Sequence, residues 1–121
     1  MIITINNKDI ELKFGVHFLR ILDRIYEEKI GHNIGYGVGI EMTVPKLVAR
    51  DAVTLSDYLY IGTAREKKRP TQEQIDDYID QAEDIESLFT EVIEELKKSN
   101  ASRSRTEEAI ERYQKELEKQ K

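Results

Sequence analysis

The sequence predicts a mainly α (α+β) fold, in which a small N-terminal β-hairpin packs on a compact bundle of about five helices and a C-terminal charged helix follows. Three observations lead to this prediction. Apolar residues alternate with polar ones near the N-terminus, they recur every three or four positions from residue 16 onward, and glycine, proline or capping residues separate the apolar runs. Alternation is typical of strands, and the longer period is typical of amphipathic helices.

The hairpin is predicted within residues 1–14. Ile3 and Ile5 fall on one face of the first strand, and the turn-forming sequence NNKD follows at residues 6–9. Alternation resumes over Ile10–Phe14. An isolated two-stranded hairpin is marginally stable in water, so this one is expected to lie on the helices.

The strongest helix signal covers residues 16–30. Phe18, Leu22 and Ile25 share one face, charged residues hold the other, and a glycine at position 31 is a natural stop. Ile21 lies off the apolar face and is flanked by charge. It is a candidate partner contact, with a partly buried place at the edge of the core as the alternative.

Shorter helices are predicted farther along the chain. One has Pro45 in its first turn, and a second opens at Thr54 in a sequence that resembles a capping box. A third opens at the Thr71–Gln74 capping box and ends near residue 80. A fourth has Asp84 as its N-cap and a wide apolar stripe behind it.

The core predicted from these patterns comprises Ile3, Ile5, Leu12, Phe14, Phe18, Leu19, Leu22, Ile25, Leu55, Leu59, Leu88, Phe89, Val92 and Leu96.

The domain expected from these elements spans residues 1–100, residues 101–106 read as a linker, and residues 107–121 form a C-terminal amphipathic helix or tail. The large apolar residues of the last segment are Ile110, Tyr113 and Leu117. A stripe this narrow suits a coiled-coil seam or the groove of a partner, so these three residues are candidate partner contacts. The alternative is a solvated tail that frays.

The glycine-rich run GHNIGYGVGIEM, residues 31–42, raises the question of a phosphate site. Its spacing fits neither the dinucleotide-binding fingerprint nor a Walker A loop, and it follows a helix rather than a strand. A flexible joint between helices is the simpler interpretation. The two histidines, His17 and His32, lack a partner at metal-binding spacing. We therefore expect no catalytic residue, no cofactor and no metal.

Composition narrows the class of protein further. The chain has 121 residues, a net charge of −5 and no cysteine, which excludes disulfide scaffolds and thiol catalysis. An acidic stretch without a single base runs from Thr71 to Leu96 and disfavours nucleic-acid binding. No apolar run is long enough to cross a membrane, and no signal peptide is evident. A soluble cytoplasmic protein is expected.

Taken in order, four segments resemble the tail assembly chaperones of long-tailed bacteriophages, in particular those of phages and prophages of Gram-positive bacteria. The segments are ITINNKDIELKFGVHFLRILDRIY, VPKLVARDAVTLSDYLYIGTA, RPTQEQIDDYID and EDIESLFTEVIEELKKSN. The resemblance covers residues 1–100, and the last twenty residues match no motif.

This resemblance implies a non-catalytic chaperone that binds the tape measure protein and keeps it soluble while the tail tube polymerises. It further implies the major tail protein as a second partner, work in the host bacterial cytoplasm and absence from the mature virion. A homo-oligomer joined through the last helix is a further hypothesis. The alternative is a bacterial adaptor or regulatory protein that binds a partner helix and is unrelated to phage assembly.

Overall fold

The architecture comes from a computed structural model that describes residues 1–30 and 38–120. Two strands and six helices are found within these ranges. In chain order they are β1 (Ile2–Ile5), β2 (Lys8–Glu11), α1 (Val16–Ile30), α2 (Gly39–Val48), α3 (Ala52–Gly62), α4 (Gln72–Asp80), α5 (Ile85–Lys98) and α6 (Arg103–Lys119). The predicted mainly α fold with an N-terminal hairpin is confirmed.

The hairpin is a two-stranded antiparallel sheet closed by a two-residue turn. Asn6 and Asn7 both have positive φ, of 52° and 63°, as a type I′ turn requires. Asparagine tolerates this left-handed conformation better than most residues. In the resulting register Ile3 pairs with Ile10, and both side chains are buried against the helices.

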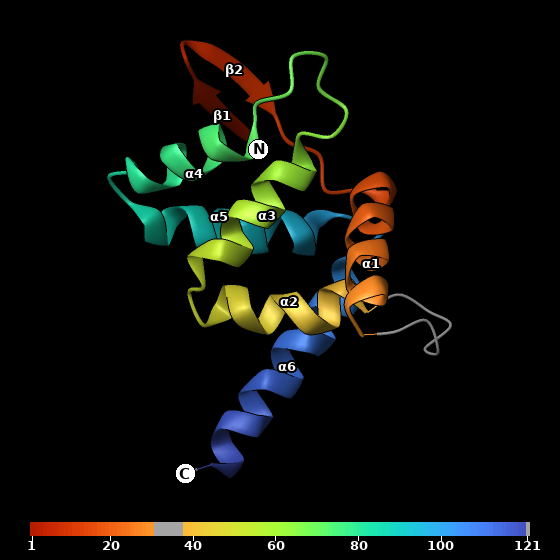
Figure 1. Cartoon of the computed structure of the whole chain (residues 1–121). Coiled ribbons are helices and arrows are strands. Elements are labelled where there is room, and N and C mark those ends of the chain that lie inside the picture. The colour runs from red at the N-terminus through yellow and green to blue at the C-terminus, as the bar shows by residue number, and fades with distance from the viewer. Residues whose placement is uncertain (31–37, 121) are drawn as a thin grey trace.

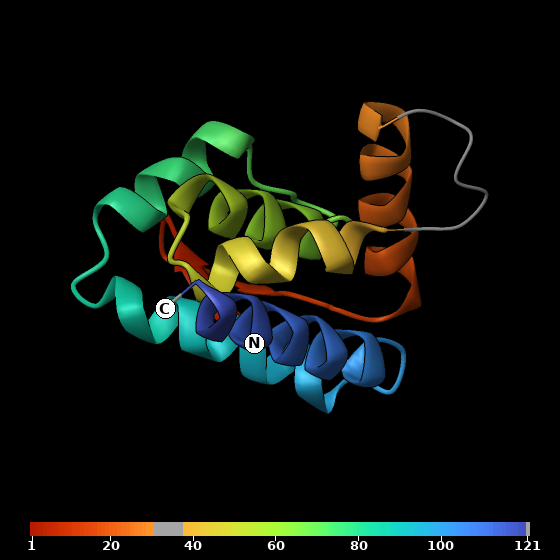
Figure 2. The ribbon, with the colours of Figure 1, turned by 90° about the horizontal axis from the view of Figure 1, so that it is seen from below.

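The helices form a compact body with the hairpin at one end (Figure 1). In Figure 1, α3 crosses α5 in the middle of the molecule, α1 stands to one side and α2 lies below. Seen from below, α6 runs between α2 and α5 (Figure 2), and it contacts both helices. The C-terminal end of α6 extends beyond the rest of the ribbon.

The core contains every residue predicted for it, although Ile5 and Ile25 are only partly buried. Phe18 links two edge-to-face ring contacts, with Phe14 at 5.0 Å and Tyr58 at 5.1 Å between ring centroids. The prediction missed several fully buried residues, which are Ile40, Val44, Leu47, Tyr58 and Ile75. Three of these belong to α2, whose first turn, residues 39–42, lies within the glycine-rich run.

Two of the predicted helix starts are confirmed. The Thr71 hydroxyl accepts a hydrogen bond from the Gln74 amide, and the Gln74 side chain accepts one from the Thr71 amide. This is the reciprocal capping box that the sequence predicts. The Asp84 carboxylate accepts from the Ser87 amide and caps α5.

Three predicted boundaries are wrong. α3 begins at Ala52 behind Asp51, and the Thr54 hydroxyl donates to the Asp51 carboxylate instead of capping the helix. Pro45 lies well inside α2 rather than in its first turn, because α2 already begins at Gly39. α6 begins at Arg103, so most of the expected 101–106 linker is helical. Hydrogen bonds from Arg105 to α1 and α2 hold this first turn of α6.

The joint predicted in the glycine-rich run falls on residues 31–37, which lie outside the described residues. Gly39, at the end of the run, is described and has a clear structural role. A Cβ atom at this position would lie 2.6 Å from Leu22 Cγ and 2.9 Å from Asp23 Oδ1. Only glycine therefore lets the start of α2 approach α1 this closely.

Candidate partner-binding surface

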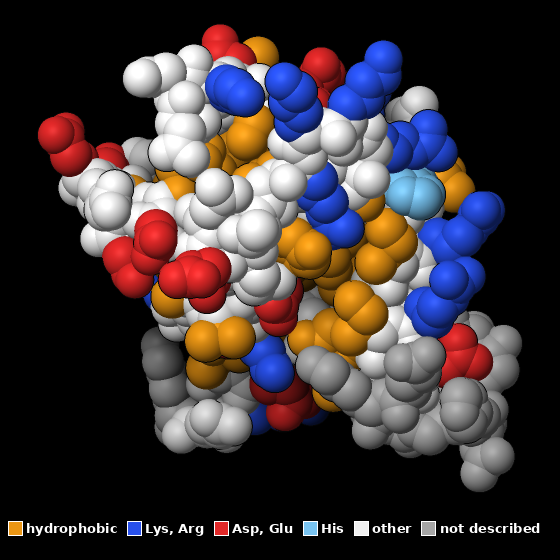
Figure 3. Space-filling view, turned by 45° about the horizontal axis from the view of Figure 1, so that its top comes forward, with side chains coloured by type: hydrophobic (Ala, Val, Ile, Leu, Met, Phe, Trp, Pro, Cys, Tyr) orange, Lys and Arg blue, Asp and Glu red, His pale blue; other side chains and the backbone are white. Residues whose placement is uncertain are grey.

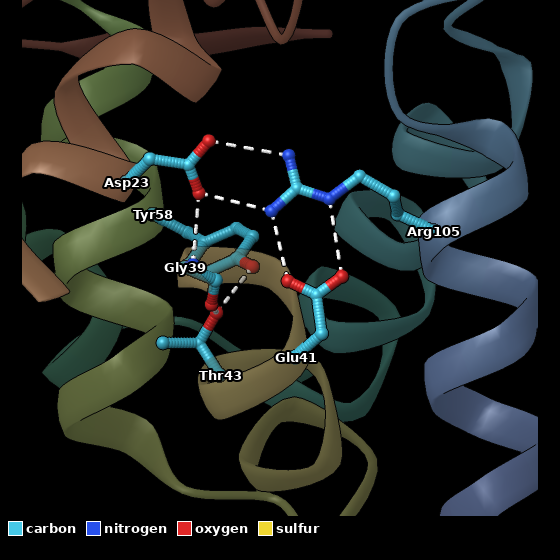
Figure 4. Close-up of polar contacts among 6 residues, drawn as sticks. All are labelled: Asp23, Gly39, Glu41, Thr43, Tyr58 and Arg105. Atoms are coloured by element: carbon cyan, nitrogen blue, oxygen red, sulfur yellow. Dashed lines mark hydrogen bonds and ion pairs between the residues drawn. The ribbon is translucent and has the colours of Figure 1, made fainter. Parts of the chain in front are cut away.

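The last helix is fastened to the body by one arginine that holds two carboxylates (Figure 4). Arg105 of α6 donates two hydrogen bonds to Asp23 of α1, at 2.9 and 3.2 Å. It donates two more to Glu41 of α2, at 2.8 and 3.1 Å. All three side chains are half-buried. Such charge-assisted, bidentate contacts are among the stronger hydrogen bonds in proteins.

This arrangement favours the charged guanidinium. The hydrogen bonds to Glu41 and Asp23 raise the pKa of Arg105 above its already high ordinary value. Asp23 also accepts a hydrogen bond from the Gly39 amide at 2.8 Å. The start of α2, the middle of α1 and the start of α6 therefore meet at a single carboxylate.

A buried hydroxyl pair lies next to this cluster (Figure 4). The Thr43 hydroxyl donates to the Gly39 carbonyl at 2.6 Å, and it lies 2.6 Å from the Tyr58 hydroxyl. A threonine hydroxyl carries one hydrogen, so Tyr58 is the donor in the second bond. Burial raises the pKa of the Tyr58 hydroxyl above its usual value of about 10. The contact joins α2 to α3.

With its first turn fixed in this way, α6 carries the predicted apolar stripe away from the body. Ile110 packs against the core and is half-buried, as is Tyr113. Leu117 is 43% exposed, and its neighbours on the helix are exposed charged residues. An ion pair between Lys115 and Glu111 at 3.0 Å supports the projecting part along the helix. The stripe therefore changes gradually from core contact to free surface.

Ile21 is not part of the same surface. It is half-buried and packs against the core from α1. Asp23 lies two positions farther along α1 and faces α6. Two positions along a helix correspond to a rotation of roughly 200°, so Ile21 points to nearly the opposite side. The structure therefore brings Ile110, Tyr113 and Leu117 together and leaves Ile21 on another side.

A separate apolar hollow of about 210 Å³ lies where α1 begins beside the end of α3. Its lining includes Val16, His17 and Ile61. Figure 3 shows apolar side chains exposed near the single histidine of this view, with lysine and arginine side chains around them. Val16 is among the most exposed large apolar residues of the described chain.

The sequence does not predict the residues that anchor α6 to the rest of the protein. Arg105 falls in the linker that the sequence predicts, and its partners lie 64 and 82 positions away. Spacing within a helix cannot reveal a contact between elements so distant in the chain. Asp23 is one of several charged residues on the predicted helix 16–30, so the sequence does not indicate that it contacts another helix.

The described residues contain no group of three or more histidine, aspartate or glutamate side chains placed to hold a metal ion. No helix in the described ranges has the length and apolar character needed to cross a bilayer. The fold and this surface define a small helical protein with a firmly anchored last helix, whose apolar stripe runs from half-buried residues to the exposed Leu117.

Comparison with protein families identifies the class. Residues 2–113 match the family model of the phage tail assembly chaperone protein, TAC, and the chain therefore belongs to this family. The match runs into α6 as far as Tyr113, thirteen residues beyond the resemblance seen in the sequence. No curated protein and no solved structure matches the chain.

Proposed function

We propose that this chain binds the tape measure protein of its phage and keeps it soluble while the tail tube polymerises around it. Membership of the tail assembly chaperone family supports this role. The single structural observation that carries it is the end of α6, which extends beyond the rest of the ribbon (Figure 1) and carries the exposed Leu117 in line with the half-buried Ile110 and Tyr113. The chaperone acts by reversible binding, and no catalytic step is required.

The stripe suits a helical partner. Ile110, Tyr113 and Leu117 stand three and four positions apart, which is the spacing with which one helix packs on another. Because Arg105 fixes the base of α6, the projecting turns are already helical before a partner arrives. A preformed helix loses less conformational entropy on binding than a disordered tail would.

Ile21 is proposed as a second contact. It lies on a different side of the molecule from the α6 stripe, so both sites could engage one long partner. Two linked contacts of modest strength give reversible but effective binding, provided that the partner spans both. The major tail protein is proposed as a further partner, and self-association through α6 as a competing use of the same stripe.

The proposed place of action is the cytoplasm of the host bacterium, and the chaperone is proposed to leave before the virion matures. The family match supports a role in tail assembly, which weighs against an adaptor unrelated to phage assembly.

Co-expression with the tape measure protein of the same phage tests this function. We expect the soluble fraction of that protein to rise when the chain is present and the two proteins to copurify. Leu117→Glu should reduce both effects without lowering the melting temperature, because Leu117 is already 43% exposed. An equally insoluble tape measure protein with and without the chain would refute the proposal.

Lys115→Gln provides the matched control. It changes the net charge by the same amount as Leu117→Glu and lies on α6, but points roughly 200° away from Leu117. Binding should be retained. If both variants lose binding equally, the effect comes from charge and the apolar stripe is not the contact. If oligomeric size alone responds to Leu117→Glu, the stripe serves self-association instead.

A further inference from the structure

A second potential binding site lies at the opposite end of the molecule from the tip of α6. A groove of about 630 Å³ separates the hairpin from the connection between α3 and α4. Lys8, Asp9 and Ile10 line one side, and residues 66–70 line the other. Both elements lie at the same end of the molecule in Figure 1.

The backbone of β2 is available along this groove. The Leu12 amide donates to the Met1 carbonyl at 2.8 Å, so these two residues form a hydrogen-bonded pair. Bonded and non-bonded pairs alternate along an antiparallel ladder. In the observed register, Asp9 and Glu11 therefore direct their N–H and C=O groups away from β1.

Just beyond β2, the same edge already forms one backbone hydrogen bond with another part of the chain. The Lys13 amide, next in the same alternation, donates to the Gly62 carbonyl at the end of α3, at 3.0 Å. Toward the turn, the amides and carbonyls of Asp9 and Glu11 make no backbone hydrogen bond with any residue that the structure describes. An exposed strand edge of this kind is a template for an added strand.

The charge around the groove differs from that of the whole chain. Lys8, Lys67, Lys68 and Arg69 line it, against Asp9 and Glu66, whereas the chain carries −5 overall. Arg69 is engaged with Tyr60 through a cation–π contact at 3.8 Å. The three lysines form no ion pair with the described residues. Figure 3 shows lysine and arginine side chains gathered around exposed apolar atoms at this end.

We propose that this groove binds an extended, acidic peptide segment of a partner protein, which adds as a third strand to the edge of β2. Backbone hydrogen bonds to Asp9 and Glu11 would provide affinity, and the three lysines would select acidic side chains. The half-buried Ile5 and the buried Pro70 give the segment an apolar floor. This site is separate from the α6 stripe and does not depend on the tape measure protein as partner.

A peptide fits this site better than a nucleic acid. The strand edge offers paired donors and acceptors at the spacing of a polypeptide backbone, whereas phosphates accept hydrogen bonds only. Among the residues that the structure describes, no aromatic side chain lines the groove for bases to stack on.

Titration of the ¹⁵N-labelled full chain tests the proposal. The peptide is an acetylated and amidated octapeptide of alternating glutamate and valine, and its counterpart has lysine in place of glutamate. We expect the acidic peptide to shift the amide resonances of Asp9, Glu11 and residues 66–70, and to slow hydrogen exchange at Asp9 and Glu11 by about tenfold or more. The basic peptide should do neither.

Variants separate the backbone contribution from the charge contribution. Glu11→Pro removes an N–H that the hairpin does not use, which an edge strand tolerates. It should weaken binding at least about fivefold, whereas Glu11→Ala keeps the N–H and should bind normally. The double variant Lys67→Glu/Lys68→Glu should weaken binding about tenfold or more. The matched control Lys97→Glu/Lys98→Glu, on α5, should not.

Four results would overturn the proposal. They are equal binding of the two peptides, shifts confined to α6, normal binding by folded Glu11→Pro, and an oligothymidylate that shifts the same amides more strongly than the acidic peptide. The last would make the groove a nucleic-acid site. None of these results bears on the tape measure protein, so the function proposed above stands or falls separately.

Discussion

Arg105 and Asp23 lie 82 positions apart in the chain and are joined by two hydrogen bonds, of 2.9 and 3.2 Å. The same guanidinium holds Glu41. One cation thus compensates two half-buried carboxylates from different helices. Without Arg105 these carboxylates would remain close together and unneutralised.

Replacing Arg105 by methionine should therefore destabilise the fold. We expect a loss of about 1–3 kcal/mol in the free energy of unfolding, measured by urea denaturation, because charge-assisted hydrogen bonds are lost and two like charges are left facing each other. Arg112→Met is the control. Arg112 is an exposed residue of the same helix, and its replacement should change stability by less than about 0.5 kcal/mol. Equal effects of the two variants would mean that the cluster contributes nothing specific.

Gly39→Ala should destabilise because its Cβ would overlap the side chain of Leu22. We expect a cost of about 1–3 kcal/mol, as for other overpacking substitutions. Gly15→Ala is the matched control, since a Cβ there meets nothing within 4 Å. That substitution should be neutral or slightly stabilising. A thermal melt distinguishes the two, and a higher melting temperature for Gly39→Ala would contradict the close approach of α2 to α1.

Two buried threonines should respond oppositely to replacement by valine. Thr43→Val leaves the buried Tyr58 hydroxyl without its acceptor and should cost about 1–3 kcal/mol. The Thr106 hydroxyl is buried and has no hydrogen-bond partner among the described residues. Thr106→Val removes that unsatisfied group and should raise stability by up to about 1 kcal/mol. Urea midpoints measured side by side decide the signs, and a loss for Thr106→Val would reveal a partner for its hydroxyl.

Stability should fall in alkaline solution in part because of Tyr58. Burial raises its pKa in the folded state above the unfolded value of about 10, so the folded state retains the proton longer. The contribution is fully present below about pH 10 and is lost as the pH rises above it. Tyr58→Phe should flatten this decline in the urea midpoint between about pH 9 and 11.

Local signals were sufficient to predict the elements that are defined within a few residues of sequence. The Asn6-Asn7 turn, the period of α1, the Thr71–Gln74 box and the Asp84 cap each depend on neighbours in the chain. The starts of α2 and α6 could not be predicted in the same way. Gly39 and Arg105 are weak helix signals, and their positions are determined by Asp23, Leu22 and Glu41 in other helices.

The candidate site could likewise be predicted only where it depends on neighbours in the sequence. Spacing alone placed Ile110, Tyr113 and Leu117 on one stripe, since three residues of one helix share a face whatever surrounds them. Which of the three is covered by the body, and which is exposed, depends on how far α6 runs along α2 and α5. The groove beside β2 could not be predicted from the sequence. Its basic residues at 67–69 read as a solvated linker, and its two sides come together only when the end of α3 meets the hairpin at Gly62.

The position of Arg105 also bears on how the chain folds during its own synthesis. The ribosome makes Asp23 and Glu41 long before the cation that neutralises them. Until α6 emerges, the side of α2 that it covers stays open to water and to other nascent chains. Closure of the body is thus a late event, and the same step that completes the fold also places the helix proposed to bind the partner.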